Sequence, residues 1–438
     1  AQNITVSVTD ANDTPIATAA SYYMNLKPQA QTTGYVTLAG TDEDGDSLTY
    51  SIVSNGSYGS ASVSGTSLTY VTSSGTQSAS SESFTFKVND GTVDSSNATI
   101  TISLRTDPLY QYQWHLNNTG QTNFATDAGT SGVDLNLDTI ISSGIDGSGI
   151  TVAVVDSELQ IAHEDLSPNM VPNKSYDYAN SDNDPTSSDS SKYHGTAVAG
   201  IIGADAWNNL GGRGVAPDAS LVGYNYMSNQ GVSNFVDALG GAADGGADTS
   251  DVDIFNMSFG TALNASFPGI FSLTKEAALL NGVTNLRSGK GAIYVNAAGN
   301  DWHESKSGST YFCGPNYGTS NTVRDEQFPC WDANLDSNFA TPVIIGVASL
   351  SAADVRAHYS TPGSSVWVSG FGGQTGGNTD HIGGVYIGGN KPAIMTTDVS
   401  SCSKGGVQAG ISAGSGQNGN AFNNGDHSEN ASCNYNSG

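Results

Sequence analysis

Two short apolar runs constrain the fold of this chain most strongly. The runs "GITVAVVD" (149–156) and "GAIYVNAAG" (291–299) are almost continuously hydrophobic, which is typical of strands buried on both faces. The stretches 232–246 and 266–289 have helical spacing of their apolar residues. Buried strands that alternate with helices predict an α/β domain of three layers, with a mostly parallel sheet covered on both faces. In such domains the reactive groups gather at the carboxyl ends of the strands.

The first hundred residues follow a different pattern. They are rich in Ser, Thr, Asn and Gly and contain alternating runs such as "SLTYSIV", "ESFTFKV" and "ATITISL" between turn signals, which predicts an all-β sandwich of antiparallel strands. The run "ITVSVTD" (4–10) returns as "ITISLRTD" (100–107). We therefore expect residues 1–13 to end a preceding repeat and its linker, 14–105 to form one sandwich, and 106–438 to form the α/β domain. Further repeats upstream are expected.

The charge of the chain limits its partners. There are 41 acidic and 14 basic residues, for a net charge of −27, so the surface field repels nucleic acid and anionic membranes and attracts cations. We therefore expect no nucleic-acid partner, and we expect that the chain can bind Ca²⁺. No stretch approaches the roughly 20 apolar residues that a membrane span needs, and the first residues lack a secretory signal pattern.

All four cysteines lie in the last third of the chain, at positions 313, 330, 402 and 433. Their spacing does not match a zinc site. Among the three possible connectivities we expect sequential pairing, Cys313 with Cys330 and Cys402 with Cys433. Each bridge would close a short loop, stabilise the fold by about 3 kcal/mol, and imply an oxidising compartment, which favours a secreted or cell-surface protein.

Two acidic clusters in the first hundred residues offer the hard oxygen ligands that calcium prefers. They comprise Asp10, Asn12 and Asp13 in the first, and Asp42, Asp44 and Asp46 in the second. The second cluster is not an EF-hand loop, because its glycine falls at the fourth position instead of the sixth. The clusters resemble the linker and acidic loop of cadherin-like repeats in bacterial surface proteins. Solvated acidic turns without a ligand are the alternative.

Three polar residues follow the predicted strands or open a helix of the α/β domain. Asp156 ends the run "TVAVVD", where a carboxylate could orient a histidine and stabilise its charged form. His194 opens the small-residue helix "HGTAVAG", and Asn300 follows the strand "AIYVNAAG", where its amide could donate to an oxyanion. The segment Ser258-Phe259-Gly260, after "VDIFNM", could pair with an extended peptide. Alone, such an aspartate is usually a turn or cap and such a histidine structural, but the order of all four motifs is specific.

These motifs, together with the entry segment "DPLYQYQWHLNNTGQ" (107–121), resemble the subtilases, and within them the kexin or proprotein-convertase branch and its bacterial relatives. The resemblance runs from about residue 107 to the end of the chain. It implies that Asp156 is the orienting acid, His194 the general base and Asn300 the oxyanion donor. The implied fold is subtilisin-like, and the implied reaction is hydrolysis of peptide bonds by an Asp-His-Ser triad.

The same resemblance implies two calcium sites. The first would use the side chains of Asp107, Asp165 and Asn208 and the carbonyls of Asp205, Leu210 and Gly212. The second would use Asp177, Asp182 and Asp184. Carboxylates, an amide and backbone oxygens form a ligand set for a hard cation. Ordinary acidic turns are the alternative for each site.

The sequence also departs from the family pattern. The expected Gly-Thr-Ser motif with a following proline is missing, and the Gly-Thr-Ser at 318–320 lies too close to Asn300, so we interpret Ser320 as a loop residue. We therefore expect the nucleophile to follow Gly438 and this piece alone to be inactive. The convertases carry a second aspartate where Ser157 stands, and acids after the substrate strand where "GTALNASFPG" has none. Dibasic specificity is consequently not predicted.

The leading hypothesis is a secreted, calcium-stabilised serine endopeptidase of bacterial origin with a peptide or protein substrate. A non-catalytic surface or adhesion protein, with the α/β domain as a scaffold, is the alternative. A metallohydrolase built on His163 or His194 is disfavoured, because no histidine pair has the spacing of a metal motif such as H-E-x-x-H.

Overall fold

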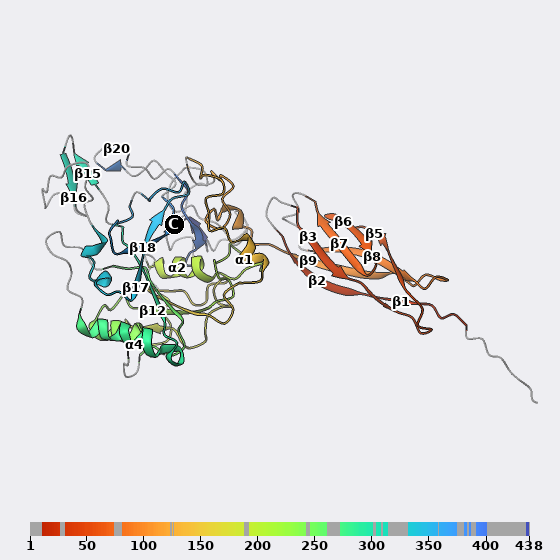
Figure 1. Cartoon of the computed structure of the whole chain (residues 1–438), viewed down its shortest axis with the longest axis horizontal. Helices are drawn as coiled ribbons and strands as arrows, with labels where there is room; N and C mark the ends of the chain where they lie inside the picture. The colour runs from red at the N-terminus through yellow and green to blue at the C-terminus, as the bar shows by residue number, and fades with distance from the viewer. Residues whose placement is uncertain are drawn as a thin grey trace, which may run out of the picture. The chain divides into compact units, whose positions relative to one another are not determined.

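The computed structural model describes most of the chain, in two compact units. The first unit is Ala1–Thr106 with Trp207–Asn209, and the second is Asp107–Ala206 with Leu210–Gly438. Both units are drawn in Figure 1. The described residues are 11–26, 31–73, 81–122, 125, 127–187, 192–241, 246–260, 272–300, 304–307, 310–313, 332–357, 359–374, 381–382, 385–386, 391–400 and 435–437.

The first unit is a β-sandwich. Its four-stranded sheet has the order β2-β9-β8-β5 and its three-stranded sheet the order β3-β7-β6, while β1 pairs with β4. One pair differs from the antiparallel prediction, because β2 runs parallel to β9 from Ala20↔Ile100 to Asn25↔Arg105. The strands are β1 (Ile16–Thr18), β2 (Ala20–Asn25), β3 (Thr33–Thr37), β4 (Ala39–Thr41), β5 (Thr49–Ser54), β6 (Gly59–Ser64), β7 (Ser67–Thr72), β8 (Ser81–Asn89) and β9 (Ala98–Arg105).

Alternating residues of the two sheets form the sandwich core. In β8, Phe84, Phe86 and Val88 are buried and the residues between them are more exposed, as expected for a strand with one face on the core. The ring of Tyr70, from the other sheet, lies 5.7 Å from that of Phe84 between centroids. The period-two pattern of the sequence therefore selects which face of each strand is buried.

The second unit is built on a parallel sheet, as the apolar runs predicted. Its order is β11-β12-β10-β13-β14-β17-β18, and every pair of neighbours runs parallel. Five of the six residues of β10 are buried, which explains why its sequence is continuously apolar. The strands are β10 (Thr151–Asp156), β11 (Tyr176–Asp177), β12 (Ser220–Asn225), β13 (Ile254–Met257), β14 (Ile293–Ala297), β17 (Ile344–Leu350) and β18 (Val366–Phe371).

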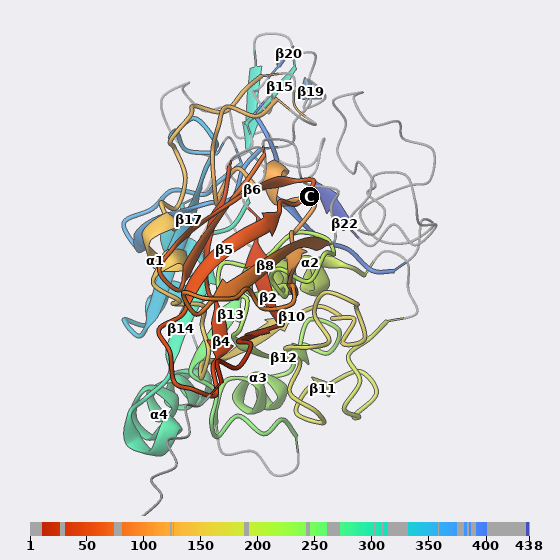
Figure 2. The same ribbon diagram turned by 90° about the vertical axis from the view of Figure 1, so that its right-hand side faces the viewer.

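Helices cover both faces of this sheet. Ala199 of α2 packs with Val152 and Val154 on one face, whereas Phe235 of α3 and Leu279 of α4 belong to the core on the other. Figures 1 and 2 show α2 and α4 on opposite sides of the strands. The helices are α1 (Asp138–Ser142), α2 (His194–Gly203), α3 (Val232–Ala238) and α4 (Leu273–Gly289), with short 3-10 turns η2 (Tyr110–Tyr112), η3 (Ala333–Leu335) and η4 (Ser337–Ala340).

One helix is shorter than its predicted range. The helix α3 ends at Ala238, and Gly240 follows with φ +84°, a left-handed conformation that commonly ends a helix. The helix α4 begins at Leu273, after Ser272 at its N-terminal cap, and residues 266–271 of the predicted range lie outside the described residues. The remaining strands form small antiparallel pairs: β15 (Glu304–Ser307) with β16 (Thr310–Cys313), β19 (His381–Ile382) with β20 (Val385–Tyr386), and β21 (Met395–Thr397) with β22 (Tyr435–Ser437).

The helix α2 is fixed by close contact with β21. The hydroxyls of Thr396 and Thr397 donate to the carbonyls of Ala197 and Thr196 at 2.7 Å. A Cβ on Gly200 would lie 2.6 Å from Thr396 Oγ1 and 2.9 Å from the backbone nitrogen of Thr397. The small side chains of this helix therefore permit a close approach that fixes its position on the sheet.

We expect Gly200→Val to destabilise the second unit by about 1–3 kcal/mol, because the new side chain overpacks the contact with β21. The measurement is a urea unfolding curve. Gly370→Val is the matched control: it lies in β18, and a Cβ there meets only Val347 Cγ1 at 3.5 Å. Equal midpoints for Gly200→Val and the unchanged protein would contradict the tight α2–β21 contact.

Candidate active site

The parallel register brings three strand ends to one edge of the sheet. Val155 of β10 lies opposite Met257 of β13, and Met257 lies opposite Asn296 of β14. Strands are about 4.8 Å apart, so the ends of β10 and β14 are roughly 10 Å apart with β13 between them. Asp156 is the last residue of β10, and the segment Ser258–Gly260 directly follows β13.

Asp156 and His194 are hydrogen-bonded. His194 Nδ1 lies 2.7 Å from Asp156 Oδ1, and the side chain of the aspartate is 2% exposed while that of the histidine is 57% exposed. An ionised carboxylate only accepts hydrogen bonds, so Nδ1 carries the proton and Nε2 of the neutral ring holds the lone pair. The exposed imidazole can therefore accept a proton from a group that approaches from solvent.

Local packing sets the position of this pair. Asp156 Oδ1 also accepts a hydrogen bond from the backbone nitrogen of Ser157 at 2.6 Å. A Cβ on Gly195 would lie 2.6 Å from the carbonyl oxygen of Glu158, so only glycine lets the first turn of α2 lie against the loop after β10. Thr196 Oγ1 accepts from the backbone nitrogen of Gln160 at 3.0 Å. These contacts explain the sequence "HGT" at the start of the helix.

The hydrogen bond that His194 makes to Asp156 raises the pKa of His194 above the ordinary value of 6.5. Partial burial opposes this shift, and the negative charge of Asp156 adds to the rise. The protonated ring is thus stabilised in the folded state. Because the folded pKa is raised, this stabilisation is fully present below pH 6.5 and is lost as the pH rises through the folded pKa.

Glu158 is a residue beside the pair that the motifs did not identify. It is 8% exposed, and its Oε1 accepts a hydrogen bond from Ser228 Oγ at 2.7 Å and lies 3.9 Å from Lys192 Nζ. Buried carboxylates are rare unless paired. The only feature of the sequence that could have indicated this residue is its position two residues after Asp156, at the end of a predicted strand.

The segment Ser258–Gly260 and Asn300 lie at the same edge of the sheet. The ring of Phe259 packs against that of Tyr226, with centroids 5.2 Å apart. Asn300 is exposed and follows β14 by three residues. The chain turns at Gly299, which has φ +98° and whose carbonyl accepts from Thr361 N at 3.0 Å. Each of these residues thus lies where parallel strands end.

The residues of the first predicted calcium site are partly brought together. Asp107 and Asp165 are fully buried, and the backbone nitrogen of Asp205 donates to the carbonyl of Asp165 at 2.9 Å. Burial lowers the pKa of Arg213, and the nearby charge of Asp107 opposes that shift. Leu210 and Gly212 lie in the second unit, whereas Asn208 groups with the first.

The acids of the second predicted calcium site lie in one turn and accept hydrogen bonds from nearby protein groups. Asp177 Oδ1 accepts from Asn225 Nδ2 at 2.7 Å. Asp182 Oδ1 accepts from the backbone nitrogen of Asp184, and Asp184 Oδ1 from that of Thr186, both at 3.0 Å. Asx turns of this kind order the loop without a cation. The predicted site therefore stays a prediction.

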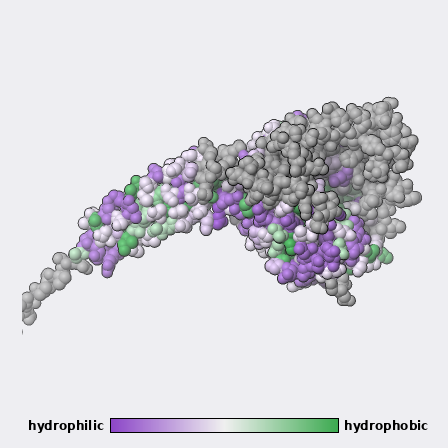
Figure 3. Space-filling view, turned by 180° about the vertical axis from the view of Figure 1, so that it is seen from behind, coloured by the Kyte–Doolittle hydropathy of each residue, from purple (hydrophilic) through white to green (hydrophobic). Residues whose placement is uncertain are grey.

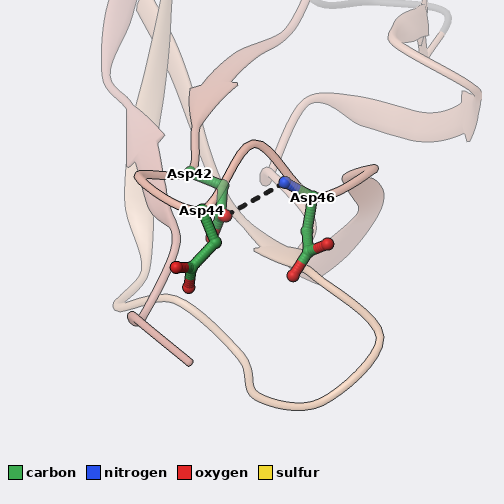
Figure 4. Close-up of side chains that lie close together, drawn as sticks. All are labelled: Asp42, Asp44 and Asp46. Carbon is green, nitrogen blue, oxygen red and sulfur yellow. Dashed lines mark hydrogen bonds between the residues drawn. The ribbon is translucent and has the colours of Figure 1, made fainter. Parts of the chain in front are cut away.

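The carboxylates of Asp42, Asp44 and Asp46 form a cluster in the first unit (Figure 4). One oxygen of each lies within 4.8 Å of the others, and this is the only such group of three acidic, histidine or cysteine residues in the described part of the chain. Asp42 Oδ1 accepts from the backbone nitrogen of Asp46 at 3.1 Å. Asp44 Oδ2 accepts from that of Asp13 at 2.6 Å, so part of the first acidic cluster lies beside the second.

Several predicted positions lie outside the described residues. These are Asp10, Ser320, and the cysteines at 330, 402 and 433, while Cys313 is the last residue of β16. The disulfide pairing, the interpretation of Ser320 and the position of the nucleophile consequently stay predictions.

Comparison with known proteins identifies the family of the second unit. Residues 147–417, more than half of the chain, match the sequence profile described as "Subtilase family". The chain belongs to the subtilase family. Residues 12–103 match the profile "Bacterial Ig domain", so the N-terminal sandwich of this subtilase is Ig-like.

Relatives of this subtilase include bacterial and animal proteases. Aeromonas extracellular serine protease from Aeromonas sobria is 34% identical over 301 residues, which cover 68% of this chain and 44% of that protein. Neuroendocrine convertase 2 from Bos taurus is 34% identical over 201 residues, or 44% of this chain and 29% of that protein. The crystal structure of the serine protease of Aeromonas sobria is similar at 32% identity with a TM-score of 0.61, covering 75% of this chain and 51% of that one. This subtilase chain thus spans about half, or less, of these relatives.

One face of the molecule shows how polar and apolar residues are distributed on its described surface. Hydrophilic residues predominate on the face drawn in Figure 3, and hydrophobic residues there are scattered. Among the described residues, no helix has both the length and the hydrophobicity needed to cross a membrane.

We expect Asp156→Asn to lower the pKa of His194, because the neutral amide no longer stabilises the imidazolium. An NMR titration of the ring protons measures this pKa. Asp354→Asn is the matched control, since it removes one exposed carboxylate and asparagine tolerates the φ of +58° at that position. An unchanged His194 pKa in Asp156→Asn would show that another group raises it.

Proposed function

We propose that this subtilase is a secreted serine endopeptidase in which Asp156 and His194 are two members of the catalytic triad. The observation that carries the proposal is the 2.7 Å hydrogen bond between a half-exposed imidazole and the buried carboxylate that accepts it at the carboxyl edge of a parallel sheet. A buried orienting acid and an accessible base are the two features that activation of a serine hydroxyl requires.

The proposed reaction begins with proton transfer to His194 Nε2. The serine hydroxyl, from a residue outside the described part of the chain, attacks the peptide carbonyl while His194 accepts its proton. Asp156 keeps Nδ1 protonated and stabilises the imidazolium that forms. The imidazolium then donates the proton to the leaving amine, and a water molecule hydrolyses the acyl-enzyme with the same histidine as base. That the serine follows Gly438 stays a prediction.

Asn300 is the proposed oxyanion donor. Its side chain is exposed, at the strand edge that also carries Asp156, which suits an amide that must reach a substrate. A donor of this kind stabilises the tetrahedral intermediate by roughly 3 kcal/mol. The segment Ser258–Gly260 is the proposed docking strand for the main chain of the peptide substrate.

Activity of the full-length protein tests the assignment of the base. We expect His194→Ala to lower kcat for a peptide substrate by at least about 10³-fold, because no other group removes the serine proton. The measurement is steady-state hydrolysis with circular dichroism of each variant. Lys290→Ala, at the exposed end of α4, is the control. Comparable kcat values for His194→Ala and the parent would reject the mechanism.

We also propose that Ca²⁺ stabilises the protein, and the Asp42–Asp44–Asp46 cluster supports this best. Three carboxylates share a volume within 4.8 Å, and Asp42 Oδ2 is buried without a hydrogen-bond partner among the described residues. Clustered acids repel one another, and a hard cation would relieve that repulsion. Asp107 and Asp165, both buried, support a second ion in the α/β unit.

Removal of calcium should lower the thermal midpoint of the first unit. A ligand at 100 times its dissociation constant stabilises by about 2.7 kcal/mol, so we expect a chelator to lower the midpoint by several degrees in calorimetry. The double variant Asp44→Asn/Asp46→Asn should have the lower midpoint already and should not respond to the chelator. A midpoint that is unaffected by chelation in the parent protein would contradict the site.

A further inference from the structure

The segment after β13 is held by a side chain of the neighbouring strand. Asn296, in β14, donates from Nδ2 to the carbonyl of Met257 at 2.9 Å and to that of Phe259 at 2.7 Å. Met257 is the last residue of β13, so regular pairing with β14 stops there. The amide of Asn296 therefore holds the last carbonyl of β13 and extends the hydrogen bonding beyond the strand to the carbonyl of Phe259.

The two acceptors determine which way the intervening residues face. In an extended strand the backbone polar groups of successive residues point to opposite sides. The carbonyls of Met257 and Phe259 both bind the side chain of β14 residue Asn296, and we infer from this alternation that the polar groups of Ser258 and Gly260 point the other way, toward β10. That is the side on which Asp156 ends β10 and binds His194.

A second asparagine fixes the orientation of the first. Asn338 Nδ2 donates to Asn296 Oδ1 at 3.1 Å, and the backbone nitrogen of Asn338 donates to Asp336 Oδ1 at 2.8 Å. Asn296 is fully buried and Asn338 is 3% exposed. With its oxygen occupied by Asn338, Asn296 directs Nδ2 toward the carbonyls of Met257 and Phe259, and a longer contact of 3.2 Å joins the same nitrogen to the carbonyl of Ala297.

The carbonyl of Phe259, which Asn296 binds, has no other donor in the β13–β14 ladder to replace it. A carbonyl that loses its donor away from water is left unsatisfied, and β13 pairs with β14 no further than Met257. The packing of Phe259 on Tyr226 anchors the side chain of the segment but not the direction of its carbonyls. The direction therefore depends on the amide of Asn296.

We propose that Asn296 is a positioning residue for substrate, which orients Ser258 and Gly260 so that their backbone groups pair with an extended peptide. The inference rests on the proposed peptidase function. It predicts that Asn296 matters for substrates long enough to reach this segment and much less for a substrate that occupies only the catalytic groups.

Two substrates separate these effects in the full-length protein. One is a tetrapeptide anilide, whose main chain can pair with Ser258 and Gly260, and the other is a single-residue ester with the same residue next to the cleaved bond. The quantity compared is the ratio of kcat/KM for the anilide to kcat/KM for the ester. A change in protein stability or in the amount of active enzyme alters both terms equally.

We expect Asn296→Asp to lower this ratio at least tenfold at pH 7.5, mainly through KM of the anilide, because a carboxylate has the same shape but repels the two carbonyls. For the ester, the kcat of the Asn296→Asp variant should stay within about threefold of the kcat of the parent. Asn285→Asp, the same change at an exposed position of α4, should leave the ratio unchanged.

A folded Asn296→Asp protein with the parent ratio would overturn the inference and leave Asn296 as a structural residue only. If Asn296→Asp does not fold, Asn338→Ala decides, since it keeps the amide and removes its support. A two- to fivefold lower ratio supports the proposal and an unchanged ratio overturns it. A parent protein inactive on both substrates would instead reject the peptidase function, and this inference with it.

Discussion

The register of three parallel strands is the constraint on which the candidate site depends. Val155, Met257 and Asn296 lie side by side across β10, β13 and β14, so the loops after these strands must leave the sheet at one edge. Residues separated by more than a hundred positions in the chain thereby become neighbours. Shifting any one of these strands by a single residue would turn its side chains to the opposite face of the sheet and separate them.

Burial separates the polar side chains at this edge into two groups, those that orient other groups and those that can reach a substrate. Asp156, Asn296 and Asn338 are at most 3% exposed and orient other groups, whereas His194 and Asn300 are exposed and can contact a substrate. A buried polar group must have a partner, so the orienting residues are fixed by their hydrogen bonds. The exposed residues are free to exchange a water contact for a substrate contact.

The sequence predicted the parallel sheet that carries the candidate site, and the roles that it assigns to Asp156, His194 and Asn300 stay predictions. The continuous apolar run before Asp156, the Gly next to His194 and the strand before Asn300 each have a local physical cause, and the parallel sheet follows from them. The order of these motifs along the chain then indicated the subtilase family. The parallel β2–β9 pair, Glu158 and the Asn296–Asn338 bond were not predicted, because each depends on contacts between distant segments that leave no periodic signal.

The contact of α2 with β21 has a consequence for how the protein is made. The hydroxyls that bind α2 come from residues about 200 positions further along the chain. At synthesis rates of about 5–20 residues per second, roughly 10–40 s pass between the emergence of His194 and that of Thr397. The helix α2 lacks its partner strand throughout that interval. The contact that fixes α2 on the sheet can therefore form only after most of the second unit has been synthesised.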